Sequence, residues 1–170
     1  MLPRLSLWLR RAAFAAVACH AALAAAAGPA PAASLYAASF KDFDRKMQPL
    51  AQYQGKTMVL YFWATWCKSC VAEVPELKSV HMKYRDRNTA VVGIAVDNAD
   101  KVQKFVKDHG IEYPMYIGGN EAIDLSKKLG NTVGGLPFVV FVDAKGNIID
   151  RILGETPKGK LESVLKAHLG

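Results

Sequence analysis

The chain has 170 residues, of which 51% are hydrophobic and 22% are charged. This length is enough for one domain with a buried core but not for two ordinary domains, and the composition is that of a globular protein. The net charge of +7 falls to +4 without Arg4, Arg10 and Arg11, because 19 Lys and Arg then face 15 Asp and Glu. The remaining basic residues are scattered along the chain, so the sequence argues against a nucleic-acid-binding protein.

Residues 1–33 have the three-part pattern of an export signal. A basic head without acidic residues precedes sixteen alanine-rich residues over 12–27, which are apolar except for His20, and small residues and prolines follow as far as Ser34. We expect a secretory signal peptide that is cleaved between Ala27 and Ser34 and takes Cys19 with it. The alternative is a retained N-terminal membrane anchor, although a spanning helix needs about 20 apolar residues. In either case we expect a periplasmic protein, soluble or anchored to the inner membrane, with one domain over residues 34–170.

The rest of the chain predicts strands that alternate with helices. Residues 39–56 carry mixed helix and turn signals and are interpreted as a lead-in to the core. Continuous apolar runs predict buried strands, and helical spacing that ends at a glycine predicts helices. In chain order we expect a strand over 57–63, a helix from the cysteines to about Tyr84 broken by Pro75, a strand over 90–96, a helix over 99–109, a strand over 113–117, a helix over 121–129, a hairpin of strands over 138–142 and 148–153, and a helix over 158–169. This order predicts an α/β fold with a central mixed sheet flanked by helices.

Two cysteines, Cys67 and Cys70, lie between the first of these strands and its helix. A pair so close together closes too short a loop for a stabilising structural disulfide, so its spacing indicates either redox exchange or half of a zinc site. The histidines that could complete a zinc site, His81, His109 and His168, are isolated from one another. No second pair of ligands is visible, and we expect neither a metal nor another cofactor beyond a redox-active disulfide.

The start of a helix at Cys67 favours reactivity of its sulfur. Free N–H groups and the helix dipole at that end stabilise an anion, so we expect the pKa of the Cys67 thiol to be lowered and Cys67 to be the exposed nucleophile. Lys68 and Ser69 between the cysteines are expected to tune this reactivity. Cys70, one turn further on, lies on the same helix face and can act as the resolving thiol.

Residues 62–70, Phe-Trp-Ala-Thr-Trp-Cys-Lys-Ser-Cys, closely resemble the active-site segment of the thioredoxin superfamily. Pro75 stands where that superfamily kinks its active-site helix, and the run Gly135-Leu136-Pro137 stands where it has a cis-proline beside the cysteines. The resemblance covers roughly residues 39–170 and implies a thioredoxin-like fold with protein thiol-disulfide oxidoreductase activity.

Two departures from thioredoxin itself narrow the resemblance. Thioredoxins have a buried aspartate six residues before the first cysteine, where this chain has Tyr61, and Glu73 follows Cys70 instead. The interval over 97–137 is also longer than thioredoxin's by a helix and a strand. These features resemble the TlpA/ResA branch of extracytoplasmic reductases, which implies that Glu73 is an active-site acid that exchanges protons with Cys70. The alternative is a solvated acid in the first turns of a helix.

The same resemblance implies a substrate-binding wall formed by Leu136 and Pro137, beside which a partner's extended chain would lie as an added strand. The alternative for Pro137 is a proline that only begins a strand. Leu136 departs from the threonine of many branch members and makes this contact more apolar. Trp66 is expected to shield the sulfur and contact partners, whereas Trp63, Phe62 and Phe138 are expected in the core.

The function that the resemblance implies is reduction of disulfides in the cell envelope. The expected partners are apocytochrome c or copper-site proteins of respiratory complexes, together with a membrane protein that donates electrons. A copper metallochaperone of thioredoxin fold and a disulfide-forming oxidase are the alternatives. A peroxidase is a weaker one, because the Pro/Thr motif of a peroxidatic cysteine is absent.

Overall fold

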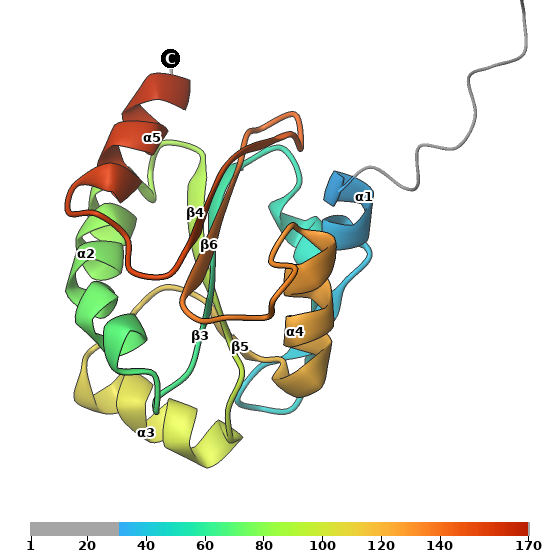
Figure 1. The fold of residues 1–170 in the computed structure, drawn as a ribbon, viewed down its shortest axis with the longest axis vertical. Coiled ribbons are helices and arrows are strands. Elements are labelled where there is room, and N and C mark those ends of the chain that lie inside the picture. Colours follow the sequence, from blue (N-terminus) through green and yellow to red (C-terminus); the bar gives the residue numbers. More distant parts are fainter. Residues whose placement is uncertain (1–30, 170) are drawn as a thin grey trace, which may run out of the picture.

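The computed structural model describes residues 31–169 (Figure 1). Most of the expected export signal, Cys19 included, lies outside these residues. The expected domain start at residue 34 falls inside a short helix, α1 (Pro31–Tyr36). Within residues 31–169, no helix combines the length and the apolar character needed to cross a membrane.

A seven-stranded mixed sheet forms the centre of the fold, in the order β2-β1-β5-β4-β3-β6-β7. Strands β3, β4 and β5 are parallel, β6 runs antiparallel to β3, and β7 closes a hairpin with β6. The strands are β1 (Ser39–Lys41), β2 (Met47–Pro49), β3 (Thr57–Trp63), β4 (Thr89–Ala95), β5 (Met115–Ile117), β6 (Phe138–Val142) and β7 (Ile148–Leu153).

Helices cover both faces of this sheet (Figure 1). Helices α2, α3 and α5 lie on one face, and α1 and α4 lie on the other. Besides α1 the helices are α2 (Lys68–Tyr84), α3 (Ala99–Asp108), α4 (Gly119–Lys128), α5 (Lys160–His168) and the 3-10 turn η1 (Leu50–Tyr53). The predicted α/β fold with a mixed, helix-flanked sheet is confirmed.

Alternation along β3 explains the two layers, because successive side chains of a strand point to opposite faces. Val59, Tyr61 and Trp63 enter the core under α2, α3 and α5. The intervening side chains, among them Leu60 and Phe62, enter the core under α1 and α4. All seven residues of β3 are buried, as the unbroken apolar run predicts for a strand covered on both faces.

One local expectation was incomplete and one was wrong. The lead-in over 39–56 contains the paired strands β1 and β2 before η1. Each strand has three residues and only Phe40 is buried, so the pair is too short to show an alternating pattern. Helix α2 also continues through Pro75 instead of breaking there. The proline lies on the exposed side of the helix, where water can satisfy the carbonyl that loses its N–H partner.

The interval between β4 and β6 contains α3, β5 and α4 in that order. Strand β5 extends the parallel part of the sheet beside β4, and α4 then returns the chain across the opposite face. The expected additional strand and helix are therefore present in this segment. They separate the cysteine segment from Pro137 in sequence, while the sheet returns the two to one edge.

We expect Leu77→Ala to lower the free energy of unfolding by about 2–5 kcal/mol, because it removes a fully buried side chain and leaves a cavity between α2 and the sheet. Urea unfolding of the oxidised protein measures this loss. Met82→Ala on the same helix is the control, since Met82 is exposed. Equal losses for the two variants would contradict the proposed packing of α2.

Candidate active site

The two cysteines lie where β3 passes into α2. After Trp63 the chain turns through residues 64–66, and Cys67 becomes the N-cap residue of α2. Its sulfur accepts a hydrogen bond from the backbone N–H of Cys70 at 3.2 Å, and the two cysteines are joined by a disulfide with a Cα–Cα distance of 5.2 Å. The sulfur of Cys67 therefore lies at the positive end of the helix, where a thiolate is stabilised once the disulfide opens.

The loop that leads to Cys67 is hydrogen-bonded to a residue that follows the neighbouring strand β4. Asp97 lies just after β4, and its carboxylate accepts hydrogen bonds from the Thr65 hydroxyl and, at 3.0 Å, from the Thr65 N–H. The same region begins α3, because the side chain of Asn98 caps that helix. These bonds fix the loop immediately before Trp66 and Cys67.

Access to the disulfide is restricted. Cys70 is fully buried and Cys67 is only 8% exposed, so in the oxidised state Cys67 is less open than we expected of an attacking thiol. Trp66 beside it is 67% exposed and Lys68 is also exposed. The Ser69 hydroxyl lies 3.6 Å from the Cys67 sulfur. A partner can therefore reach this disulfide only at the Cys67 edge.

Glu73 lies one turn beyond Cys70, and its side chain faces the interior at only 6% exposure. One carboxyl oxygen, Oε1, accepts a hydrogen bond from the backbone N–H of Thr156, in the segment between β7 and α5. The other oxygen, Oε2, is buried and has no hydrogen-bond partner among residues 31–169, and the same is true of the Thr156 hydroxyl oxygen. The alternative of a solvated helix-start acid does not fit this position.

Burial is the main cause of a raised pKa for Glu73, and the charge of Glu155 acts in the same direction. The hydrogen bond from Thr156 and the polar Tyr61 hydroxyl nearby act to lower this pKa, but they do not cancel the rise. A carboxyl with a raised pKa is protonated over a wider pH range and can both give and take a proton. Glu73 is thus a buried acid on the same helix face as Cys70.

Leu136 and Pro137 reach the same edge of the sheet from a distant part of the chain. Phe138 of β6 pairs with Phe62 of β3, which places the residues before β6 beside those that follow β3. The Leu136–Pro137 peptide bond is cis. The Leu136 side chain packs against the core that contains both cysteines. The structure therefore brings the predicted wall and the disulfide together.

The backbone before this proline is held by Asn131, a buried side chain that follows α4. Its amide donates to the Gly135 carbonyl at 2.8 Å and accepts from the Gly135 N–H at 3.1 Å. The Pro137 carbonyl accepts from the Gly154 N–H at 2.9 Å. Among residues 31–169, nothing bonds to the backbone N–H or C=O of Leu136. This leaves one unpaired peptide edge at the wall.

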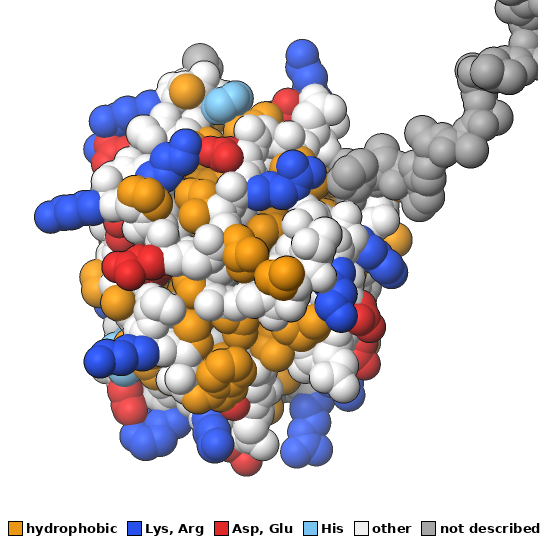
Figure 2. All heavy atoms as spheres, viewed as in Figure 1, with side chains coloured by type: hydrophobic (Ala, Val, Ile, Leu, Met, Phe, Trp, Pro, Cys, Tyr) orange, Lys and Arg blue, Asp and Glu red, His pale blue; other side chains and the backbone are white. Residues whose placement is uncertain are grey.

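Apolar side chains flank this edge. Val133 and Leu153 are both exposed, and a Cβ built on Gly135 would lie 3.3 Å from Leu153 and 3.8 Å from Val133. Figure 2 shows hydrophobic side chains gathered in the middle of one face of the molecule, with Lys and Arg side chains mostly at its periphery. With Trp66 and Leu136, these residues give the site an apolar character.

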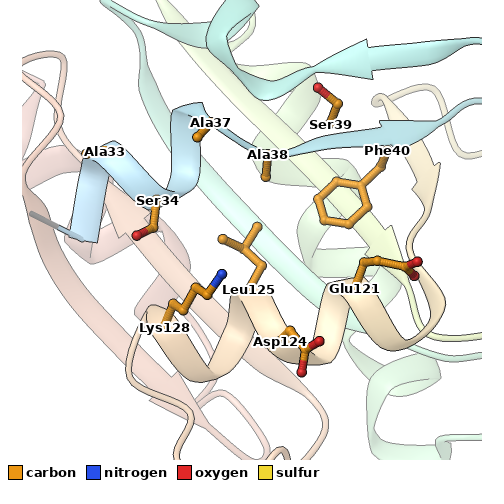
Figure 3. Close-up of a pocket in the computed structure, with 10 residues that line it drawn as sticks. All are labelled: Ala33, Ser34, Ala37, Ala38, Ser39, Phe40, Glu121, Asp124, Leu125 and Lys128. Atoms are coloured by element: carbon orange, nitrogen blue, oxygen red, sulfur yellow. The ribbon is translucent and has the colours of Figure 1, made fainter. Parts of the chain in front are cut away.

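Nothing else in the described part of the chain competes with this site as a chemical centre. No group of three or more His, Cys, Asp or Glu within residues 31–169 could hold a metal ion. A shallow hollow of about 450 Å³ lies between α1, β1 and α4, where Phe40 and Leu125 face each other (Figure 3). It adjoins the core on the other side of the sheet from the cysteines.

Sequence reasoning missed several residues of this site. Asp97 and Asn98 directly follow a predicted strand, which is a recognisable signal, because strand ends of a parallel sheet meet at one edge. Asn131 follows a predicted helix end, but nothing in the sequence shows that it reaches Gly135. Thr156 contributes its backbone N–H to Glu73, and a backbone group leaves no signal in the sequence.

The Redoxin family model matches residues 25–169 of the chain. A relative from Bacillus thuringiensis (strain Al Hakam), named thiol-disulfide oxidoreductase ResA, is 34% identical over 128 residues, which cover 74% of this chain and 70% of the relative. The protein of the same name from Oceanobacillus iheyensis is 28% identical over 127 residues, covering 74% of this chain and 64% of the relative.

Solved structures of thioredoxin-family proteins have the same fold as this chain. A thiol:disulfide interchange protein of the thioredoxin family from Chlorobium tepidum TLS superimposes with a TM-score of 0.72 at 30% identity, covering 86% of this chain and all of that one. A DsbF homologue from Corynebacterium diphtheriae superimposes with a TM-score of 0.67 at 27% identity, covering 76% of this chain and 83% of that one.

We expect the stability of the protein to fall relative to that of Glu73→Gln as pH rises. The unfolded chain releases the Glu73 proton near its ordinary pKa of 4.5, whereas the folded protein retains it to higher pH because burial raises the pKa. Folding therefore becomes less favourable above pH 4.5, by about 1.4 kcal/mol for each pH unit between the two pKa values, until the folded pKa is passed.

Urea unfolding of the two proteins between pH 4 and pH 8 measures this difference. Glu121→Gln is the control, because Glu121 is exposed on α4. A Glu73→Gln curve parallel to that of the unmodified protein would show that the Glu73 carboxyl ionises as freely as in water.

Proposed function

Because the chain belongs to the Redoxin family and is a thiol-disulfide oxidoreductase of the ResA type, we propose that it reduces disulfides of other proteins in the cell envelope. The observation that carries the proposal is the buried Glu73 carboxyl behind Cys70, with Cys67 at the accessible edge of the same disulfide. One sulfur faces the partner, and the other has an acid within one helical turn.

The chemistry proceeds in two exchanges. In the reduced protein the Cys67 thiolate attacks one sulfur of the partner's disulfide, and the other partner sulfur leaves as a thiolate. The Cys70 thiol then gives up its proton, attacks the Cys67 sulfur, and releases the first partner sulfur. Two electrons pass to the partner, which becomes a dithiol, and the Cys67–Cys70 disulfide remains.

Glu73 is the proton acceptor for Cys70 in this proposal. Cys70 is fully buried, so water does not reach its sulfur freely, and an internal base is needed to form its thiolate. The raised pKa of Glu73 allows it to take this proton and to return one when an electron donor reopens the disulfide.

The same carboxyl supports the reducing direction. A strong oxidant such as DsbA owes its potential to a stabilised reduced form, with a thiolate of very low pKa. Here the thiolate of Cys67 would accept hydrogen bonds from the Cys70 N–H and the Ser69 hydroxyl. An ionised Glu73 would add negative charge on the inner side of Cys70. This negative charge destabilises the thiolates of the reduced protein. It therefore lowers the reduction potential and favours transfer of electrons to the partner.

The partner's chain is expected to bind at Leu136. The free N–H and C=O of that residue can pair with an extended segment, as in other cases of strand addition. Trp66, Val133 and Leu153 would contact apolar side chains beside the partner's cysteine. Pro137 fixes the end of this edge, because its own carbonyl is occupied by Gly154.

The proposed partners and location rest on the resemblance to the TlpA/ResA branch and on the predicted export signal. We propose a periplasmic protein, either released by signal cleavage or held at the inner membrane, that receives electrons from a membrane donor. Its substrates would be the haem-binding thiols of apocytochrome c or cysteines of copper sites during maturation of respiratory complexes.

Replacing Cys70 by Ser should trap substrates, because the mixed disulfide on Cys67 can no longer be resolved. We expect covalent adducts when the full chain is expressed in its own host, and their proteins can be identified by mass spectrometry after non-reducing electrophoresis. Cys67→Ser/Cys70→Ser is the control and should give none. A trap without adducts would contradict the enzymatic role, and adducts lacking cytochromes and copper proteins would contradict the proposed partners.

The reduction potential separates the reducing direction from its main alternative. We expect a value nearer that of thioredoxin, about −270 mV, than that of DsbA, about −120 mV. Equilibration with glutathione or dithiothreitol buffers, followed by alkylation of free thiols, measures it. A value near −120 mV would indicate a disulfide-forming oxidase. A tight stoichiometric Cu(I) complex that requires a histidine would indicate a metallochaperone.

A further inference from the structure

Tyr61 of β3 lies on the inner side of the disulfide and has no part in the two exchanges that involve Cys67 and Cys70. Tyr61 is fully buried, and its hydroxyl donates a hydrogen bond of 2.9 Å to the backbone carbonyl of Cys70. Cys70 lies in the first turn of α2, where this carbonyl also faces the helical ladder. The tyrosine bond is therefore additional to the helix and can be exchanged without breaking it.

The Glu73 carboxylate is a stronger hydrogen-bond acceptor than this carbonyl, and it lies one helical turn beyond Cys70. Glu73 is three residues beyond Cys70 on the same helix face, and its buried Oε2 has no hydrogen-bond partner in the part of the chain that the structure describes. As a carboxylate, Glu73 needs donors at both oxygens, because an unsatisfied buried charge is costly. The Thr156 N–H serves Oε1 only.

The groups that face this carboxyl come from two segments outside α2. Tyr61 faces it from β3, while Thr156 and Glu155 face it from the segment between β7 and α5. Burial raises the pKa of Tyr61, and the charge of Glu73 raises it further, so the hydroxyl stays protonated and available as a donor. Tyr113 is a further neighbour of Tyr61 and is also held protonated by burial.

We propose that Tyr61 is a positioning residue for proton exchange between Glu73 and Cys70, its hydroxyl turning from the Cys70 carbonyl to Oε2 of Glu73 when that carboxyl ionises. The inference rests on the proposed role of Glu73 as the proton partner of Cys70. Tyr61 would then act in proton exchange from the position, six residues before Cys67, at which thioredoxins have a buried aspartate.

One proton passes between Cys70 and Glu73 in each direction of the exchange. When Cys70 attacks the mixed disulfide, its proton passes to the Glu73 carboxylate, which becomes a neutral acid, and the Tyr61 hydroxyl returns to the Cys70 carbonyl. When the disulfide is reopened, Cys70 leaves as a thiolate and takes the proton from Glu73. The new carboxylate then receives the Tyr61 hydroxyl. Tyr61 itself neither loses nor gains a proton.

The direct test is the titration of Glu73 in the oxidised protein with and without this hydroxyl. We expect Tyr61→Phe to raise the pKa of Glu73 by about one, since a hydrogen bond to a charged group is lost. Carbon-13 NMR of the labelled Glu73 carboxyl follows the titration, and an unchanged pKa would overturn the proposal. Tyr113→Phe is the matched control, because Tyr113 is buried in the same core and is expected to leave Glu73 unchanged.

Kinetics provides the second test. The pH profile of Cys70 alkylation in the reduced protein should move in Tyr61→Phe, whereas Tyr61→Phe/Glu73→Gln should behave as Glu73→Gln alone. A further shift in the double variant would show that Tyr61 acts on Cys70 without Glu73, and would overturn the proposal. If Glu73→Gln leaves the profile unaltered, the proposed role of Glu73 fails. If only Tyr61→Phe leaves it unaltered, the inference alone fails.

The unmodified protein offers a measurement that does not depend on any variant folding. With tyrosine labelled at Cζ, we expect the Tyr61 signal to move with the same midpoint as the Glu73 carboxyl, because the hydroxyl changes acceptor. A Tyr61 signal that stays constant through the Glu73 titration would overturn the proposal.

Discussion

Strand β3 is paired along both of its edges and buried on both of its faces, and the active site depends on this double constraint. Its parallel pairing with β4 brings Asp97 to the loop that carries Cys67, and its antiparallel pairing with β6 brings Leu136 and Pro137 to the same edge. Its alternation directs Tyr61 and Trp63 into the core beneath α2. A register slip of one residue would direct these side chains to the opposite face.

Helix α2 converts this edge into a polarised redox site. Its N-terminus carries Cys67 at the accessible edge of the disulfide, while its inner face presents Cys70 and Glu73 to a core that excludes water. The environment of the two sulfurs therefore differs, although they are three residues apart. That asymmetry supports the proposed roles, in which Cys67 is the sulfur that a partner reaches and Cys70 is the thiol that exchanges its proton inside the protein.

The unsatisfied buried polar atoms of Glu73 and Thr156, close to Cys70, lower the stability of the folded protein. In the oxidised state Glu73 Oε2 and the Thr156 hydroxyl have no hydrogen-bond partners among the described residues, and unsatisfied buried polar groups are uncommon in folded proteins. A carboxyl that alternates between neutral and ionised forms cannot have ideal partners in both. The Tyr61 hydroxyl, bonded to an exchangeable acceptor, offers a physical way to serve each form in turn.

The sequence by itself determined the α/β class, the strand-to-helix position of Cys67 and Cys70, and the placing of Pro137 just before a strand, because these depend on local apolar pattern and spacing. Short strands such as β1 and β2 have too few residues to show an alternating apolar pattern. The sequence also did not show that Pro75 lies on the exposed side of α2. Only the tertiary structure decided that Glu73 is buried, that Thr156 reaches it from a distant segment, and that Asn131 holds Gly135. These contacts join residues far apart in the chain, and one of them uses a backbone group that every residue but proline carries.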